Sequence, residues 1–321
     1  MTCSPGRLDK AMHMLDKAED ASQLDLLTAK AIMQVYHEHW LGRHSYHTTG
    51  IEKEITIQLG DKSLPPLAGR VDIEARDLNT SQDCIIDHKT SSQSLDSQSY
   101  WDALGQDPQV LAYAAAFPTH EIIWDVIKKP TIRPRSLGKA ALNELKETRS
   151  YFVREDVDEV VIGEALATGQ ECPRLFAYRL TAEYRSNPSK YFARRNITPS
   201  VFAVARFIKG FDQVRRDQAE AIHARDRIYR NGYACTGKYG ACPFLRVCNG
   251  DEQLESSRFE DKLPTMDGEY LSVSGYNDWN TCRQKWAYKY LQRKQAAKRS
   301  HALGFGSLLH KGLEGWWSDE N

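Results

Sequence analysis

Four short apolar runs between residues 51 and 127 constrain the fold of this chain more than any other feature of its sequence. The first run alternates apolar and polar residues and the last is mostly apolar, patterns that are typical of β-strands. A stretch with helical spacing lies between the third and the fourth run. We therefore predict an α/β core in the order β-β-β-α-β, with strands over Ile51–Leu59, Arg70–Arg76, Cys84–Lys89 and Glu121–Ile127 and a helix over Ser99–Phe117.

The rest of the chain divides into helical and turn-rich stretches. Leu24–Trp40 has the apolar spacing of an amphipathic helix, and residues 136–230 are mostly of polar helical pattern. A Gly- and Cys-rich segment over 232–250 precedes a polar stretch over 251–267, and helical spacing returns from 272 to 317. The polar stretch is the best candidate for a linker between two parts of the chain.

Composition excludes several classes of protein. The 321 residues include 43 Lys and Arg and 43 Asp and Glu, so the formal net charge is zero. This balance argues against a general coat for polyanions, although a local basic channel is compatible with it. No apolar run approaches the ~20 residues that cross a bilayer, and residues 1–20 lack the pattern of a secretory signal. We expect a cytoplasmic protein that has no membrane partner.

Two of the predicted strands carry acidic side chains that are expected to meet. Asp87 and Lys89 lie on the same side of an extended strand, whereas His88 points to the other side. If the strands pair, Asp72 lies beside Asp87, and two carboxylates together favour Mg²⁺ or Mn²⁺. Lys89 would then orient or deprotonate a water molecule, or stabilise the charge that develops on a phosphate.

An ordinary ion pair on a surface strand gives the same Asp-x-Lys pattern, and charged residues are usually solvated. The context favours a site, because the buried pair Ile85 and Ile86 precedes Asp87. In addition, Gln109 and Tyr113 are four residues apart, so they share one face of the following helix and can reach the strand ends.

These motifs together resemble the RecB-like branch of the PD-(D/E)XK nucleases. The matching residues are Gly69-Arg70-Val71-Asp72, Ile86-Asp87-His88-Lys89-Thr90, and Gln109 through Tyr113. The resemblance implies a restriction-endonuclease-like fold with a mixed sheet flanked by helices. It also implies a metal site made by Asp72, Asp87 and the main-chain carbonyl of His88, a catalytic Lys89, and a position near DNA for Gln109 and Tyr113.

Three of the seven cysteines crowd into a turn-rich segment as Cys235-x6-Cys242-Pro-x4-Cys248. Such spacing suits a zinc ion or an iron–sulfur cluster, and the lack of a Cys-x2-4-Cys knuckle favours the cluster. Cys282 is the natural candidate for a fourth ligand. The distribution resembles the RecB-like nucleases with a [4Fe–4S] cluster, in which one cysteine follows a Ser-x-Ser helix start and three lie at the far end of the domain. Three buried structural thiols are the alternative reading.

The same resemblance extends to Gly306-x-x-x-His310, since the family carries such a motif on a helix ahead of its strands. It implies that His310 completes the metal site. Here, however, the motif follows the cysteines, so we infer a circular permutation in which residues 268–321 complete the nuclease core of residues 1–250. The rival account is a truncated second copy that reaches a neighbouring molecule by domain swapping.

Basic and aromatic residues interleave after Cys282 and again over 185–195, a mixture that suits a DNA strand with charges on phosphates and rings on bases. A solvated helix face is the alternative reading of such a run. The candidate DNA-binding residues of the first run are Arg283, Lys285, Trp286 and Lys289.

The resemblance implies a DNA nuclease that requires Mg²⁺ or Mn²⁺ and carries a [4Fe–4S] cluster, with Zn²⁺ as the alternative metal. We expect an exonuclease that acts on DNA ends or single strands in a bacterial or phage-infected cell. The chain has no Gly-x4-Gly-Lys-Ser/Thr motif, so a helicase would be a separate partner, as would a recombination factor. The main alternatives are a DNA-binding or recombination accessory module that does not cleave, and a zinc-stapled interaction protein.

Overall fold

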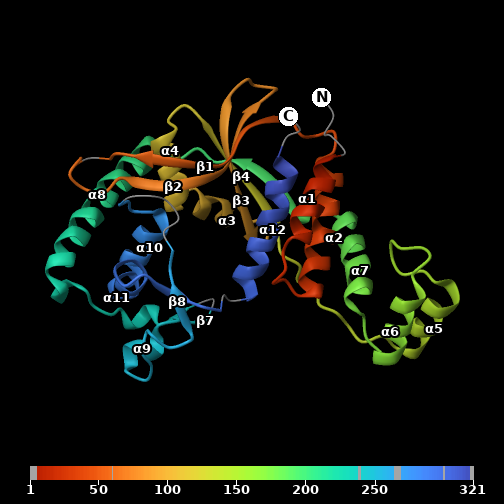
Figure 1. Ribbon diagram of the computed structural model, residues 1–321. Helices are drawn as coiled ribbons and strands as arrows, with labels where there is room; N and C mark the ends of the chain where they lie inside the picture. The colour runs from red at the N-terminus through yellow and green to blue at the C-terminus, as the bar shows by residue number, and fades with distance from the viewer. Residues whose placement is uncertain (1–5, 60, 238–239, 264–268, 299–300, 319–321) are drawn as a thin grey trace.

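A computed structural model describes residues 6–59, 61–237, 240–263, 269–298 and 301–318 of this protein. Its centre is a five-stranded mixed sheet in the order β1-β2-β3-β4-β5 (Figure 1). β3 and β4 are parallel, and the other neighbouring strands are antiparallel. The strands are β1 (Tyr46–Ile57), β2 (Leu67–Asp77), β3 (Asp83–Ser91), β4 (Glu121–Lys128) and β5 (Phe192–Asn196). The predicted α/β class with a mixed sheet flanked by helices is therefore confirmed.

The fifth strand corrects the sequence prediction. Residues 136–230 were expected to be mostly helical, yet β5 lies within them and pairs with β4. The apolar pattern of this strand is interrupted by Arg194, a charged residue that sequence patterns place at the surface. Its side chain is only 5% exposed, because it pairs with the buried Asp125. The basic stretch 185–195 is thus partly a sheet edge and not a continuous DNA-binding helix.

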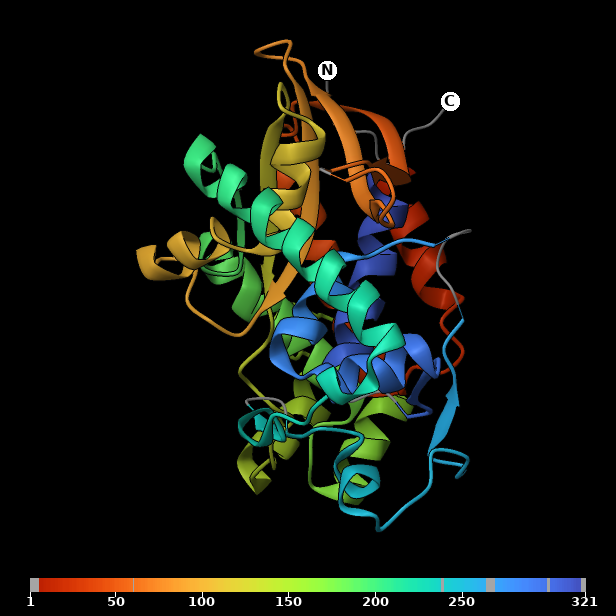
Figure 2. The ribbon, with the colours of Figure 1, turned by 90° about the vertical axis from the view of Figure 1, so that its left-hand side faces the viewer.

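Helices cover both faces of the sheet (Figures 1 and 2). One face packs on a core shared by the first helices and the last one, and the other face packs on a core that contains the helices following β3. The helices on the first face are α1 (Gly6–Asp16), α2 (Gln23–Trp40), α7 (Pro173–Ser186) and α12 (His301–Trp317). Those near the second face are α3 (Gln98–Leu104), α4 (Pro108–Ala116), α8 (Val201–His223) and α10 (Val273–Thr281).

The single helix predicted over Ser99–Phe117 is wrong, because α3 and α4 are separate. The chain leaves the helix at Gly105, and α4 restarts with Asp107 as its N-cap and Pro108 in its first turn. The Asp107 carboxylate accepts a hydrogen bond from the backbone N–H of Gln109 at 2.9 Å. This cap fixes where the second helix begins, and hence where Gln109 and Tyr113 lie.

The last helix packs directly on the first. The backbones of α12 and α1 approach so closely that a Cβ on Gly315 would lie 2.8 Å from the carbonyl oxygen of Lys10. Only glycine fits at such a crossing. Arg7 also donates a hydrogen bond to the carbonyl of Trp316 at 3.2 Å. Residues from the two ends of the sequence therefore belong to one core within a single chain.

The segment predicted as a linker contains regular structure. Within residues 251–263, the short strand β8 (Phe259–Asp261) pairs with β9 (Lys294–Ala296). Leu254 and Phe259 are buried against Phe244. Residues 264–267 of the predicted linker lie outside the described part of the chain. The described part of the segment is thus packed onto the residues on either side of it.

The remaining elements are short or lie away from the sheet. α5 and α6 form a small lobe with its own apolar cluster at the right of Figure 1. Across the described residues, no helix is both long and apolar enough to cross a membrane. These elements are α5 (Lys139–Thr148), α6 (Glu159–Thr168), β6 (Thr236–Gly237), β7 (Gly240–Ala241), α9 (Leu245–Asn249), α11 (Arg283–Trp286), a π-helical turn η4 (Ala287–Leu291) and the 3-10 turns η1 (Pro188–Lys190), η2 (Arg225–Arg227) and η3 (Gly232–Ala234).

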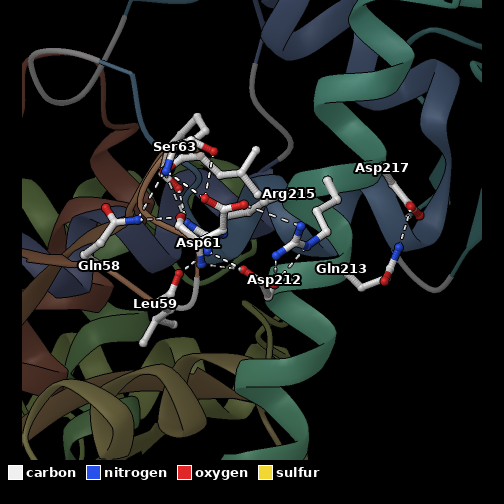
Figure 3. Close-up of polar contacts among 11 residues, drawn as sticks. Gln58, Leu59, Asp61, Ser63, Asp212, Gln213, Arg215 and Asp217 are labelled. Carbon is white, nitrogen blue, oxygen red and sulfur yellow. Dashed lines mark hydrogen bonds and ion pairs between the residues drawn. The ribbon is translucent and has the colours of Figure 1, made fainter.

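A buried arginine fastens α8 to the loop that joins β1 and β2 (Figure 3). Arg215 donates hydrogen bonds to the carbonyl oxygens of Leu59 and Pro65, the latter at 2.8 Å, and pairs with Asp212 at 2.5 Å. Because these carbonyls would otherwise be left without partners inside the protein, the arginine satisfies the loop backbone. The loop therefore holds β1 and β2 in register beside the second face of the sheet.

Candidate metal centre

The acidic residues lie where β2 and β3 separate. The two strands pair from Arg76↔Asp83 to Ile73↔Ile86, and this register puts Asp72 beside Asp87 just beyond the last pair. The backbone N–H of His88 donates a hydrogen bond to Asp72 Oδ2 at 2.8 Å. β3 meanwhile continues in parallel with β4 as far as Ser91. Both carboxylates are buried at this fork.

A chain of hydrogen bonds from α4 fixes the Asp87 carboxylate. Gln109 Nε2 donates to Asp87 Oδ1 at 2.6 Å, and the Tyr113 hydroxyl donates to the same oxygen at 2.8 Å. Lys89 Nζ donates to Gln109 Oε1 at 2.5 Å, lies 3.4 Å from Asp87 Oδ2, and sits over the Trp124 ring at 4.4 Å from its centroid. Asp87 and Lys89 of β3 and Gln109 and Tyr113 of α4 therefore form one network of polar contacts.

His310 reaches this network from α12. Its Nε2 lies 3.2 Å from Asp72 Oδ2 and 3.6 Å from Glu52 Oε1. This nitrogen is buried, and it makes no hydrogen bond to any described residue. The structure thus brings together, within one chain, an imidazole and the carboxylates that the sequence separates by more than two hundred positions.

Glu52 was missed by the sequence analysis. It lies on β1 opposite Asp72, between the pairs Ile51↔Ile73 and Lys53↔Val71. Its φ of 49° is in the left-handed region, which is uncommon for a residue other than glycine. The only signal in the sequence is one glutamate in an alternating strand, and alternation alone does not reveal a change of backbone conformation.

The bend at Glu52 explains how groups from both faces meet. Before the bend, Ile51 and Ile73 pack with the core beneath α12, whereas beyond it Ile55 and Val71 pack with the core beneath α4. The edge of the sheet therefore turns from one core to the other at Asp72. As a result, the helix that carries His310 and the strand that carries Asp87 approach the same point.

The electrostatics of these groups fit a divalent cation. Burial raises the pKa of Asp72 well above its usual range, and the nearby Asp87 carboxylate raises it further. Burial also raises the pKa of Asp87, despite the opposing effects of Lys89 and Tyr113. Burial lowers the pKa of His310 to about 4, so its imidazole is neutral at pH 7 and offers a lone pair. Carboxylates that repel each other and a neutral imidazole without a hydrogen bond suit Mg²⁺ or Mn²⁺.

The side chain of His88 points away from the carboxylates, as its place in the strand predicts. It lies on the face covered by α12, with its ring 5.7 Å from that of His310 and its Nδ1 3.5 Å from Asp125 Oδ2. Asp125 is fully buried, accepts a hydrogen bond from the Tyr36 hydroxyl, and pairs with Arg194 at 3.2 Å. Although burial opposes it, Arg194 holds the pKa of Asp125 at about 2. A charged, paired carboxylate therefore supports the strand behind the site.

The four predicted cluster ligands come from two segments that meet. Cys235, Cys242 and Cys248 lie in or beside η3, β7 and α9, and Cys282 caps the end of α10. The backbone N–H of Asn231 donates to Cys282 Sγ at 3.4 Å, and Cys235 Sγ lies 3.7 Å from the carbonyl of the same asparagine. Both segments therefore contact one residue.

The thiols of this segment affect one another's pKa values. Burial raises the pKa of Cys248, and charge on Cys282 and Cys235 would raise it further. Burial also raises the pKa of Cys242, with smaller effects of Cys248 and Cys282. Among the described residues, however, no three of the cysteine sulfurs lie within 4.8 Å of one another.

The residues predicted to bind DNA occupy two different environments. Trp286 is only 4% exposed, and its ring packs edge-on against Trp279 with 4.8 Å between centroids. Its predicted role in stacking on bases does not fit this position, because the ring completes the core beneath α8. The other three remain near the surface in ion pairs, Lys285 and Lys289 with Asp278 at 2.7 and 2.5 Å and Arg283 with Asp217 at 3.4 Å.

Comparisons with models of protein families, with curated proteins and with solved structures found no match for this chain.

Proposed function

We propose that this chain is a metal-dependent DNA nuclease of PD-(D/E)XK type with a restriction-endonuclease-like core. It would hydrolyse phosphodiester bonds at DNA ends or in single strands. The observation that carries the proposal is the approach of His310 Nε2 to Asp72 Oδ2, at 3.2 Å, beside the network of Asp87, Lys89, Gln109 and Tyr113. An ordinary surface ion pair would not explain two buried carboxylates with raised pKa values beside a neutral imidazole.

The groups that would hold Mg²⁺ or Mn²⁺ are the side chains of Asp72, Asp87 and His310 and the carbonyl of His88. When bound, such an ion makes water a better nucleophile at neutral pH and offsets the negative charge of the phosphate. Glu52, Asp72 and His310 each offer one ligand atom, and these atoms lie within 4.8 Å of one another, whereas Asp87 is not a member of this group among the described residues. Carboxylate and carbonyl oxygens are the ligands that Mg²⁺ and Mn²⁺ prefer in proteins.

The chain's own residues position the reactants. Gln109 and Tyr113 fix the orientation of the Asp87 carboxylate, because both donate to the same oxygen. Lys89 is held between Gln109 Oε1 and the Trp124 ring, so its ammonium has one preferred position. At that position it orients the attacking water and stabilises the charge that develops on the phosphate oxygens.

The proposal includes a [4Fe–4S] cluster held by Cys235, Cys242, Cys248 and Cys282. What supports it is the meeting of the two cysteine-bearing segments at Asn231, which contacts both Cys282 and Cys235. The cluster would fasten α10 to the segment after α8. Its role would be structural, with the four thiolates as ligands.

The test is a cleavage assay on end-labelled single- and double-stranded DNA with Mn²⁺, using protein purified without oxygen. We expect Lys89→Ala to lower kcat by about 10²–10⁴-fold, the usual contribution of one positioned catalytic group. Binding of Mn²⁺, measured by calorimetry, should be retained by this variant and lost in His310→Ala. Lys53→Ala is the matched control, because Lys53 is an exposed lysine of β1 that pairs with Glu74.

Two outcomes would contradict the proposal. Unchanged cleavage by Lys89→Ala would exclude the catalytic role of this network. Wild-type protein that binds Mn²⁺ and DNA but never cleaves would instead favour the accessory DNA-binding module.

A further inference from the structure

A cavity of about 390 Å³ opens beside the candidate metal centre, between the end of β3 and α12. It shares Lys89 and His310 with the centre and extends from there to residues that the proposed chemistry leaves unused. Its polar lining residues include Lys89, Thr90, Lys129, Ser307 and His310. The volume lies within the range of pockets that bind small ligands, and it suits a group about the size of one nucleotide.

The lining has the chemistry of an anion site. It presents two lysine ammonium groups and two hydroxyls, and none of the described residues that line it is acidic. Burial lowers the pKa of Lys129 from its usual range. Lysine ammonium groups and hydroxyls are common partners of the phosphate oxygens of DNA.

Gly306 keeps this cavity open. A Cβ at this position would lie 3.2 Å from Thr90 Oγ1 and 3.8 Å from Lys129 Nζ, so a side chain would enter the space between them. Gly306 is the first residue of the Gly-x-x-x-His motif, and His310, one turn further along α12, points to the carboxylates. The two residues of the motif thus face two neighbouring sites, although the proposed metal centre uses only the histidine.

We propose that this cavity binds the backbone phosphate next to the scissile phosphodiester of a DNA strand, with Lys129, Thr90 and Ser307 as its contacts. The inference rests on the proposed function, because it takes the scissile phosphate to lie at the metal centre. Lys89 and His310 border both sites, so neighbouring phosphates of one strand occupy them together. The cavity then sets the register of the strand and acts before the chemical step.

The first test measures binding without cleavage. A fluorescent single-stranded oligonucleotide is titrated with protein in Ca²⁺ at several salt concentrations. We expect Lys129→Ala to weaken binding three- to tenfold and to reduce the slope of log K against log salt by about 0.7, the value for one lost phosphate contact on a single strand. Lys128→Ala is the matched control, because Lys128 is the preceding residue and does not line the cavity.

The second test locates the contact. Single uncharged methylphosphonate linkages are placed at each position of the oligonucleotide in turn. One position next to the scissile linkage should weaken wild-type binding three- to tenfold and leave binding by Lys129→Ala unchanged. Gly306→Val should weaken binding to both the unmodified and the substituted strand, and its melting temperature reports whether the helix is intact.

The outcomes separate the two proposals. If Lys129→Ala keeps the salt slope of the wild type, or loses affinity equally at every substituted position, the cavity does not bind this phosphate. This would hold even if the protein cleaves DNA. If the expected pattern appears but wild-type protein never cleaves, the cavity binds DNA as inferred and only the nuclease function fails.

Discussion

The carboxylate site and the cysteine segment differ in how their side chains are held. Asp72 and Asp87 lie on adjacent strands, and Asp87 is fixed by two hydrogen bonds from α4. The cysteines lie in turns and short helices, where Cys248 Sγ has the Tyr288 hydroxyl as a distant neighbour at 3.9 Å. Strand register thus forms the first site, whereas the second is held together by much weaker contacts.

If both proposed metals are correct, this difference implies that the stability of the two sites depends on metal binding in opposite ways. At the carboxylate site the fold holds repelling groups together, so the protein is strained until a cation binds. At the cysteine segment, burial raises the pKa of Cys242 and Cys248, which favours their neutral thiols. A cluster needs them as thiolates, so its binding free energy contributes to folding. Removing a carboxylate ligand should therefore stabilise the protein that holds no cation. Removing a cysteine ligand should instead destabilise the protein that holds the cluster.

The largest effect is expected at the cysteine segment. Cys248→Ser should lose most of the iron and sulfide of the proposed cluster and lower Tm by about 4–7 °C, which corresponds to roughly 3–5 kcal/mol of lost metal-coupled stability. Iron and sulfide analysis and calorimetry would measure both. Cys172→Ser is the control, because Cys172 is at the N-cap position of α7, where serine is favoured. Wild-type protein that is colourless and holds stoichiometric zinc would contradict the cluster.

A smaller change in Tm, an increase, is expected when a carboxylate of the other site is removed. Since burial raises the pKa of Asp72, its protonated form stabilises the metal-free protein at low pH, and this contribution is lost as pH rises through the raised pKa. Asp72→Asn, which cannot ionise, should raise Tm without metal by roughly 2–4 °C at pH 8. It should have less effect at pH 5. Melting curves in a chelator would measure this, with the exposed Asp83→Asn as control; a lower Tm at pH 8 would contradict it.

The smallest effect concerns the tuning of the cluster. When Cys248 is a thiolate, the Tyr288 hydroxyl becomes the donor of their contact, and hydrogen bonds to sulfur help to set cluster potentials. Tyr288→Phe should therefore lower the reduction potential by roughly 20–40 mV, about 0.5–1 kcal/mol for one electron. A redox titration followed by absorbance would measure the shift. Tyr233→Phe should leave the potential unchanged, since Tyr233 is 98% exposed, and equal shifts in both variants would exclude the contact.

Sequence patterns predicted the parts of the fold whose signal is local. The four apolar runs predicted β1 to β4 and, through the pairing of β2 with β3, the position of Asp72 beside Asp87. β5 was missed because Arg194 looks like a surface charge, and only Asp125 on the neighbouring strand makes its burial affordable. The placement of Trp286 failed for the opposite reason, since an aromatic residue in a basic run was read as a surface group although it packs on Trp279.

The candidate site was predictable in its residues and not in its shape. The motifs named Asp72, Asp87 and His310, but the distance between His310 and Asp72 follows from the packing of α12 against α1 and α2. Glu52 joins them only because the backbone of β1 bends at this residue, and this bend depends on which core each side of the strand meets. Contacts between distant segments decide both features, and periodicity in a single segment does not report them.

The position of His310 on the last described helix also has a consequence for the timing of synthesis. While the ribosome is still making the chain, the strands with Asp72 and Asp87 emerge long before α12, so the newly made protein lacks the imidazole. If the proposed function is correct, a nascent chain from which α12 has not yet emerged cannot cut nucleic acid in its surroundings. Activity would begin only when α12 docks against α1, which makes completion of the fold the event that switches the enzyme on.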